Sequence, residues 1–138
     1  MAVDTPATIA IIGAGPIGLE TGLYARFLGY DVLLFEQDKV ASHVLDWGTA
    51  PILSPFAENC SSLGMAALRA QDESYQPPQP DECLTAKDWG ERYLLPVAET
   101  DLLQGNIKTG CQVLSVGRPD FLKTDDSTAE ERADQPFL

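Results

Sequence analysis

The chain has 138 residues, of which 44% are hydrophobic, and its formal net charge at pH 7 is −12. This length and apolar content suffice for one domain with its own core, whereas the excess of acidic residues argues against nucleic acid and anionic membrane surfaces as partners. The first residues form no basic leader and the first apolar stretch is broken by glycine and proline, so we expect no signal peptide, no membrane span and a cytoplasmic location.

The cysteines and the single histidine exclude two further classes of site. Cys60, Cys83 and Cys111 form no C-x-x-C pair, and His43 is the one histidine of the chain. An odd number of isolated cysteines predicts no disulfide framework. One histidine without a cysteine pair predicts no metal centre.

The strongest chemical signal lies within residues 7–37. A short β-branched segment over 8–12, which we expect to be a buried parallel strand, leads into a glycine-rich loop over 13–18 and a helical stretch over 16–28. A second apolar segment over 31–36 ends in an acid. Strand, glycine loop, helix, strand and terminal acid in this order predict a dinucleotide-binding βαβ unit, and therefore an α/β fold with a Rossmann-like parallel sheet.

Each residue type in this unit has an expected role. Gly13 permits a sharp turn out of the strand, Gly15 lets a pyrophosphate approach the backbone, and Gly18 lets the helix pack closely on the strand. The helix N-terminus directs its N–H groups and its dipole toward the phosphates. Glu36 is placed to accept hydrogen bonds from the adenosine ribose, and its charge disfavours a 2′-phosphate. The predicted cofactor-binding residues of this unit are Gly13, Ala14, Gly15, Pro16, Ile17, Gly18, Glu36 and Gln37.

Residues 38–105 are interpreted as a helical insertion, with a loop over 37–55. We predict a helix within 56–70 that is capped by Asn59, Ser61 or Ser62, then a loop over 71–82 and a helix that begins after Thr85. Pro96 marks either a break or the first position of a new helix, and a second short helix is expected to run to Leu103. A further strand is expected in 107–118, most clearly over 111–116, followed by an acidic loop over 119–135. We expect Glu20 to be a surface residue, and the first helix to bury one broad apolar face made of Ile17, Leu19, Leu23, Tyr24, Phe27 and Leu28.

The stretch from Ile11 to Glu36 resembles the N-terminal FAD-binding segment of flavoproteins with two dinucleotide-binding folds. The segments 43–48, 53–56, 92–96 and 113–116 are similar to a group of bacterial FAD-dependent oxidoreductases that are related to flavin monooxygenases and thioredoxin-reductase-like enzymes. The resemblance covers most of residues 7–118. It implies an FAD cofactor, reduction by NAD(P)H, contact of Val113 with adenine, and an N-terminal portion of a longer enzyme.

Two departures narrow this resemblance. Flavin monooxygenases often carry a Gly-Gly pair before a Trp in the loop after the acid, and here no such pair precedes Trp47. Disulfide reductases carry a redox cysteine pair shortly after this region, and here Cys60 stands alone. The resemblance therefore does not extend to disulfide reduction or to a monooxygenase-like flavin contact by this loop.

The residues leave alternatives open. An NAD-dependent dehydrogenase uses the same βαβ unit, and a non-catalytic nucleotide-binding module fits if the protein ends at Leu138. The sequence assigns neither catalytic residues nor a substrate. His43 is either an acid–base group or a structural residue, and Trp47 either stacks near the flavin or anchors its loop on the core.

Overall fold

A computed structural model describes residues 7–118, 120–122, 124–133 and 137, and it has an α/β architecture. Three parallel strands form one open sheet in the order β1-β2-β3, and their bounds are Thr8–Ile12, Asp31–Phe35 and Ile107–Lys108. Ile9 lies opposite Val32, and Leu34 lies opposite Ile107. The predicted α/β fold with a parallel sheet is therefore confirmed.

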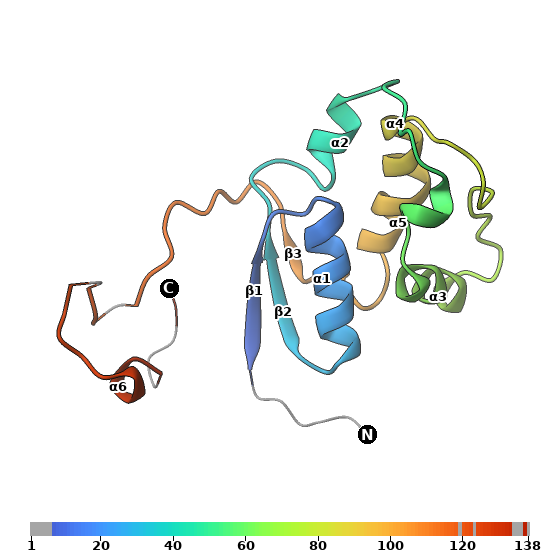
Figure 1. Cartoon of the computed structure of the whole chain (residues 1–138). Helices are drawn as coiled ribbons and strands as arrows, with labels where there is room; N and C mark the ends of the chain where they lie inside the picture. Colours follow the sequence, from blue (N-terminus) through green and yellow to red (C-terminus); the bar gives the residue numbers. More distant parts are fainter. Residues whose placement is uncertain (1–6, 119, 123, 134–136, 138) are drawn as a thin grey trace.

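Helix α1 (Pro16–Phe27) joins β1 to β2, and the other helices of the main body lie between β2 and β3 in the sequence. In Figure 1, α1 lies against one face of the sheet, with α3 and α5 beyond it. A final short helix, α6 (Ala129–Ala133), belongs to the segment that runs away from the sheet. The elements between β2 and β3 are α2 (Ser42–Asp46), the 3₁₀ turn η1 (Phe56–Glu58), α3 (Ser62–Gln71), α4 (Ala86–Trp89), the π-helical turn η2 (Gly90–Leu94) and α5 (Leu95–Ala98).

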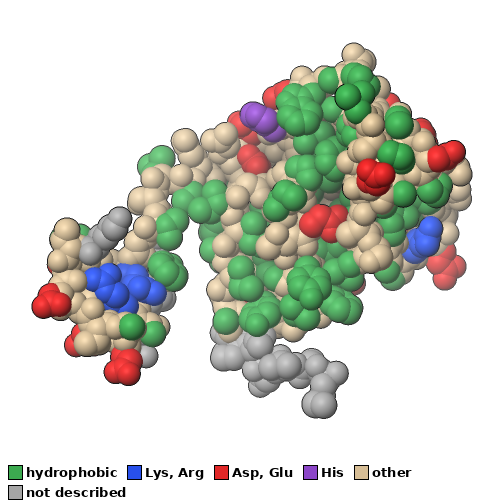
Figure 2. Space-filling model, in the orientation of Figure 1, with side chains coloured by type: hydrophobic (Ala, Val, Ile, Leu, Met, Phe, Trp, Pro, Cys, Tyr) green, Lys and Arg blue, Asp and Glu red, His purple; other side chains and the backbone are tan. Residues whose placement is uncertain are grey.

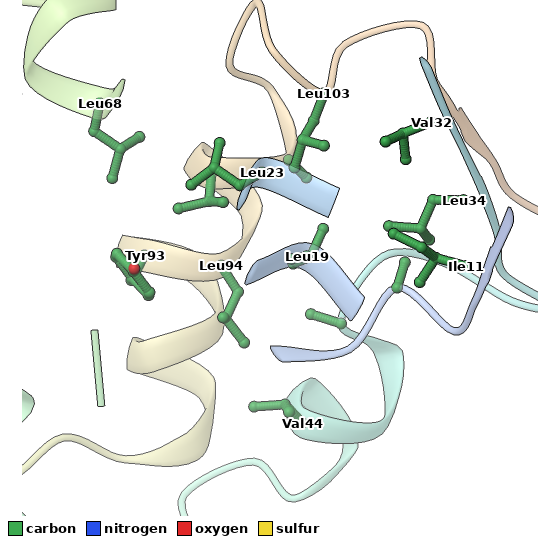
Figure 3. Close-up of a cluster of buried hydrophobic side chains, with 14 of the residues drawn as sticks. Ile11, Leu19, Leu23, Val32, Leu34, Val44, Leu68, Tyr93, Leu94 and Leu103 are labelled. Carbon is green, nitrogen blue, oxygen red and sulfur yellow. The ribbon is translucent and has the colours of Figure 1, made fainter. Parts of the chain in front are cut away.

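The core lies between the sheet and the helices. Side chains from the strands meet α1 on one side, and α1 in turn meets η2 and the segment before β3 (Figure 3). Burial of these aliphatic side chains is the main term that holds the layers together. The fully buried residues include Leu19, Leu23, Leu34, Tyr93, Leu94 and Leu103.

Local capping explains where several helices begin and end. Gly29 follows α1 with a φ of +91°, a conformation that suits glycine and ends the helix. The Ser61 hydroxyl accepts a hydrogen bond from the Gly64 N–H at 2.8 Å and caps α3. The Thr85 hydroxyl accepts from the Asp88 N–H at 3.1 Å and caps α4. The predicted helix start at Thr85 is confirmed, and of the three candidate caps Asn59, Ser61 and Ser62 it is Ser61 that caps α3.

The helices of the main body cover one face of the sheet. Ile12 is 60% exposed and Leu33 is also exposed, so the prediction that the first strand is buried holds for one face alone. The prediction of a broad buried face on α1 is also wrong, because only part of that face is covered. Leu19 and Leu23 are buried, whereas Ile17 is 81% exposed. Hydrophobic side chains accordingly gather on the surface in Figure 2, and the exposed ones of α1 and its C-cap are Ile17, Tyr24, Phe27 and Leu28.

The further strand expected within 107–118 is present as β3, but its predicted extent over 111–116 is wrong. The chain pairs with β2 at Ile107–Lys108 only, turns at Gly110 with a φ of +64°, and then continues without strand structure. Leu114 is 86% exposed. A strand needs a neighbour for its N–H and C=O groups, and the described residues offer none beside this segment.

Three other boundaries also differ from prediction. The stretch 37–55 contains α2 and is not a loop throughout. Pro96 does not break the helical run after Thr85 but lies in the first turn of α5, which agrees with the second of its two interpretations. Helix α5 ends at Ala98, so the predicted second helix does not reach Leu103. Within the predicted acidic loop, α6 forms, and residues 119, 123 and 134–136 lie outside the described residues.

Candidate functional site

The glycine loop connects the end of β1 to α1, and its first glycine is required by the backbone. Gly13 has a φ of +99°, which side-chain-bearing residues rarely adopt. Its N–H donates to the Phe35 carbonyl oxygen at 2.7 Å, so the carboxyl ends of β1 and β2 are tied together. The loop therefore begins at the edge of the sheet where open α/β folds bind ligands.

Gly18 is required by packing. A Cβ at this position would overlap the carbonyl oxygen of Gly13 and would lie 3.6 Å from the Ile11 side chain. Gly22, one turn later, is also tight, because a Cβ there would lie 3.1 Å from Leu103 Cδ2. These glycines allow α1 to lie against the loop and the core.

Gly15 differs from Gly13 and Gly18, because neither its backbone conformation nor its packing requires a glycine. Its φ of −81° and ψ of −173° are extended values that any residue adopts, and a Cβ built on it would meet no atom within 4 Å. The protein's own conformation and packing therefore do not require a glycine here. Gly15 lines a cavity of about 390 Å³, which we call the loop cavity.

Glu36 follows β2, and two backbone N–H groups orient its carboxylate. Its Oε2 accepts the Ala14 N–H at 2.8 Å, and its Oε1 accepts the Asp38 N–H at 2.9 Å. An ionised carboxylate offers about four acceptor positions, so two hydrogen bonds leave capacity for further donors. Glu36 is half-buried and lines the loop cavity.

The segment after β3 forms another wall of the loop cavity. The Cys111 N–H donates to the Glu36 carbonyl oxygen at 2.8 Å, and the Gly110 N–H donates to the Asp38 carbonyl oxygen at 3.1 Å. These bonds hold Val113 near the glycine loop although it is not in a strand. The loop cavity is lined by Ile12, Gly13, Gly15, Phe35, Glu36, Gln37, Asp38, Ala41, Ser42, His43, Cys111, Gln112 and Val113.

The predicted site residues fall into two groups. The loop cavity brings together Gly13, Gly15, Glu36, Gln37 and Val113. The others do not line it: Ala14 is fully buried and contributes its N–H to Glu36, Gly18 packs beneath the loop, and Pro16 and Ile17 line a neighbouring cavity.

The two residues whose roles the sequence left open, His43 and Trp47, lie in different places relative to the loop cavity. His43, at the start of α2, is exposed and lines the loop cavity. Trp47 lines neither cavity and is 58% exposed, so it does not anchor its loop by burial. Sequence reasoning missed Ser42, which lines the loop cavity. Ser42 begins α2 after Ala41, which has a φ of +56°, and no local sequence signal marks this position.

The neighbouring cavity has a volume of about 360 Å³, and we call it the side-chain cavity. At its wall the Tyr93 hydroxyl donates to Glu20 Oε1 at 2.6 Å and accepts the Ser61 N–H at 3.0 Å. Glu20 is thus not the simple surface residue that the sequence predicts. The lining residues are Pro16, Ile17, Glu20, Glu58, Asn59, Cys60, Ser61, Trp89, Tyr93 and Leu94.

Burial and Glu20 control the ionisation of two groups in the side-chain cavity. Burial raises the pKa of Tyr93 well above its ordinary value, and the hydrogen bond to Glu20 raises it further. Burial also raises the pKa of the Cys60 thiol, with a second contribution from the nearby Glu20 carboxylate. Both groups are therefore neutral at pH 7.

The described residues contain neither a cluster of potential metal ligands nor a candidate membrane span. No group of three or more His, Cys, Asp or Glu side chains there is placed to hold a metal ion. No helix in the part of the chain that the structure describes is long and apolar enough to cross a membrane.

Comparisons of the chain with protein-family models, with curated proteins and with solved structures give no match. The function is therefore inferred from the geometry of the site and from the resemblance of its motifs.

Proposed function

We propose that the loop cavity binds the ADP half of a dinucleotide, and that the chain is the FAD-binding part of an FAD-dependent oxidoreductase with a Rossmann-like sheet. The strand order β1-β2-β3 in parallel supports this, because it is one half of the doubly wound order in which dinucleotides bind at the carboxyl ends of the strands. The glycine loop meets the N-terminus of α1 at that same end.

The observation that carries the proposal is the open space at Gly15. The fold itself explains Gly13 through its backbone conformation and Gly18 through packing, but it leaves Gly15 without a reason to be glycine. A pyrophosphate that approaches the backbone supplies that reason, since any side chain would occupy its place. The N–H groups of the first turn of α1 have no intrahelical partners, and with the helix dipole they would bind the phosphates.

Glu36 would bind the adenosine ribose. Its carboxylate is held by the Ala14 and Asp38 N–H groups and retains acceptor capacity for the two ribose hydroxyls. A 2′-phosphate would bring a second negative charge against it, so the site would discriminate against cofactors that carry one. Gln37 and Val113, on the walls beside Glu36, would contact the adenosine.

The choice of FAD rests on the resemblance of the segments around residues 43–56, 92–96 and 113–116. When bound, the flavin supplies the redox chemistry, and the residues of this chain bind and orient its ADP half. NAD is the second candidate, because the glycine loop and Glu36 suit its ADP half equally well. We expect NAD(P)H to reduce the flavin, as the resemblance implies, and we assign no catalytic residue.

The test is a calorimetric titration of the protein with ADP and with ADP carrying a 2′-phosphate. We expect ADP to bind at least about tenfold more tightly, a difference of about 1.4 kcal/mol. The variant Glu36→Gln, which keeps the size of the side chain and removes its charge, should reduce this preference. Equal binding of the two nucleotides to the wild-type protein would contradict the role of Glu36.

The cofactor is then identified by adding FAD or NAD and removing the excess by gel filtration. Retention of a flavin absorption spectrum supports the flavoprotein. Binding of NAD by a protein that stays colourless with FAD would favour the dehydrogenase.

A further inference from the structure

The side-chain cavity is a second candidate site, and the dinucleotide proposal does not account for it. It lies on the other side of the α1 N-terminus from the loop cavity, because Pro16 and Ile17 line it while Gly13 and Gly15 line the loop cavity. Its volume of about 360 Å³ lies within the range of pockets that hold small organic ligands.

The charge of this cavity has one sign. Glu20 and Glu58 line it, and no Lys, Arg or His is among the described residues that do so. The raised pKa values of Cys60 and Tyr93 keep both groups neutral. In Figure 2, Lys and Arg side chains are visible only at the margin of the main body and in the segment beyond residue 117.

The basic residues of α4 and η2 lie close to acidic side chains that do not line the cavity. Arg92 Nη1 lies 2.7 Å from Glu82 Oε1, and Lys87 Nζ lies 3.8 Å from Glu91 Oε1. The two carboxylates on the cavity wall are thus not neutralised by these cations.

Tyr93 fixes the position of the Glu20 carboxylate. The tyrosine is 1% exposed, and its hydroxyl receives the Ser61 N–H, so its single proton is directed to Glu20 Oε1. Glu20 Oε2 accepts no hydrogen bond from the described residues and remains an acceptor. A carboxylate held in this way is oriented before any ligand arrives, which lowers the entropic cost of binding.

The remaining wall is apolar and aromatic. The Trp89 indole N–H donates to the Asn59 carbonyl oxygen at 2.9 Å, which holds its ring at the cavity beside Ile17 and Leu94. Tyr93 lies within the π-helical turn η2, and Trp89 immediately precedes that turn at the end of α4. A π-helical turn is a rare conformation that occurs frequently at functional sites. A carboxylate beside an apolar and aromatic surface is the chemistry that recognises an organic cation with an apolar body.

We propose that the side-chain cavity binds a small organic ammonium ion, with its apolar body against Ile17 and Trp89 and its cationic head on Glu20. Glu58 adds to the negative potential at the rim. The proposal does not rest on the dinucleotide site, since none of these four residues lines the loop cavity.

The test uses 2-phenylethylammonium as the probe and 3-phenylpropionate as its anionic counterpart at pH 7. Binding is followed by the NMR signal of the Trp89 indole N–H, in the Trp47→Phe variant so that one indole signal remains. We expect a saturable shift with the amine and none with the acid. An acid that shifts the signal as strongly as the amine, or an amine that produces no saturable shift, would overturn the proposal.

Two variants test whether Glu20 binds the cationic head of the ligand. Glu20→Gln should weaken the amine by about tenfold or more, because it removes a charge-assisted hydrogen bond while its amide oxygen can still accept from Tyr93. Glu73→Gln, which makes the same charge change outside the cavity, should leave the affinity within about twofold. Unchanged amine affinity in Glu20→Gln would overturn the assignment.

Competition separates this ligand from the cofactor. Saturating ADP should leave amine binding unchanged, and FAD should do the same. Displacement of the amine by FAD but not by ADP would assign the side-chain cavity to the distal half of the cofactor and overturn the amine proposal. Loss of ADP binding with retained amine binding would contradict only the dinucleotide proposal.

Discussion

The two cavities flank the N-terminal end of α1, and they are built by different means. The loop cavity is formed by backbone: the turn at Gly13, the open space at Gly15, and a carboxylate held by two main-chain N–H groups. The side-chain cavity is formed by Glu20, Trp89 and Tyr93, which come from three separate turns of helix. The comparison shows that a backbone-built site leaves a short motif in the sequence, whereas a side-chain-built site does not.

The largest expected effect is at the glycine that joins the loop to the helix. In Gly18→Ala the new Cβ overlaps the Gly13 carbonyl oxygen, so α1 or the loop must shift. We expect the free energy of unfolding to fall by about 3 kcal/mol or more, measured by urea denaturation.

Gly117→Ala is the matched control, because a Cβ there would meet no atom within 4 Å. Its free energy of unfolding should stay within about 0.5 kcal/mol of wild type. A Gly18→Ala variant as stable as this control would show that the close approach of α1 to the loop is not required.

A smaller effect is expected for the hydroxyl that organises the side-chain cavity. Tyr93→Phe removes the partner of Glu20 and leaves the Ser61 N–H without its acceptor. We expect a loss of about 1–3 kcal/mol in the free energy of unfolding. Tyr24→Phe, at an exposed position on α1, should change it by less than about 0.5 kcal/mol. Equal effects of the two substitutions would contradict the role of the Tyr93 hydroxyl in organising this cavity.

The ionisation of Tyr93 predicts a pH dependence above neutrality. The folded state raises the pKa of the phenol above the value near 10 of the unfolded chain, so it holds the proton more tightly. This contribution to stability is fully present below about pH 10 and is lost as the pH rises above it.

Wild type should therefore lose unfolding free energy faster than Tyr93→Phe above about pH 10, by at most about 1.4 kcal/mol for each pH unit. The measurement is a set of urea denaturations of both proteins between about pH 8 and pH 11. Parallel pH profiles would contradict the raised pKa. The pKa of Tyr75 is raised as well, but its contribution cancels in the difference between the two proteins.

The parts of the fold that sequence reasoning predicted are those with local causes. The β1-α1-β2 unit follows from apolar segments and glycine spacing within about 30 residues, and the caps at Ser61 and Thr85 follow from single side chains. Helix α6 had an equally local signal that the prediction did not use. Thr128 and Glu131 cap it reciprocally, with N–H to side-chain oxygen distances of 2.8 and 3.2 Å.

The parts that were not predicted depend on distant residues. Residues 111–116 have a strand-like composition, but a strand forms only where a neighbour can pair with it. The Tyr93–Glu20 hydrogen bond joins residues 73 positions apart, and no spacing rule connects them. In the candidate site, the glycines and Glu36 were identified from their motif, whereas Ser42 and the side-chain cavity required the tertiary structure.

If the space above Gly15 is kept open for a dinucleotide phosphate, Gly15→Ala should weaken cofactor binding without disturbing the fold. The substitution meets no atom of the protein and should cost less than about 1 kcal/mol of unfolding free energy, the amount expected for a poorer N-cap residue. We predict that its dissociation constant for FAD, measured by calorimetry beside wild type, rises at least about tenfold. A folded Gly15→Ala protein that binds FAD as tightly as wild type, or a wild-type protein that does not bind FAD, would contradict the proposed FAD site.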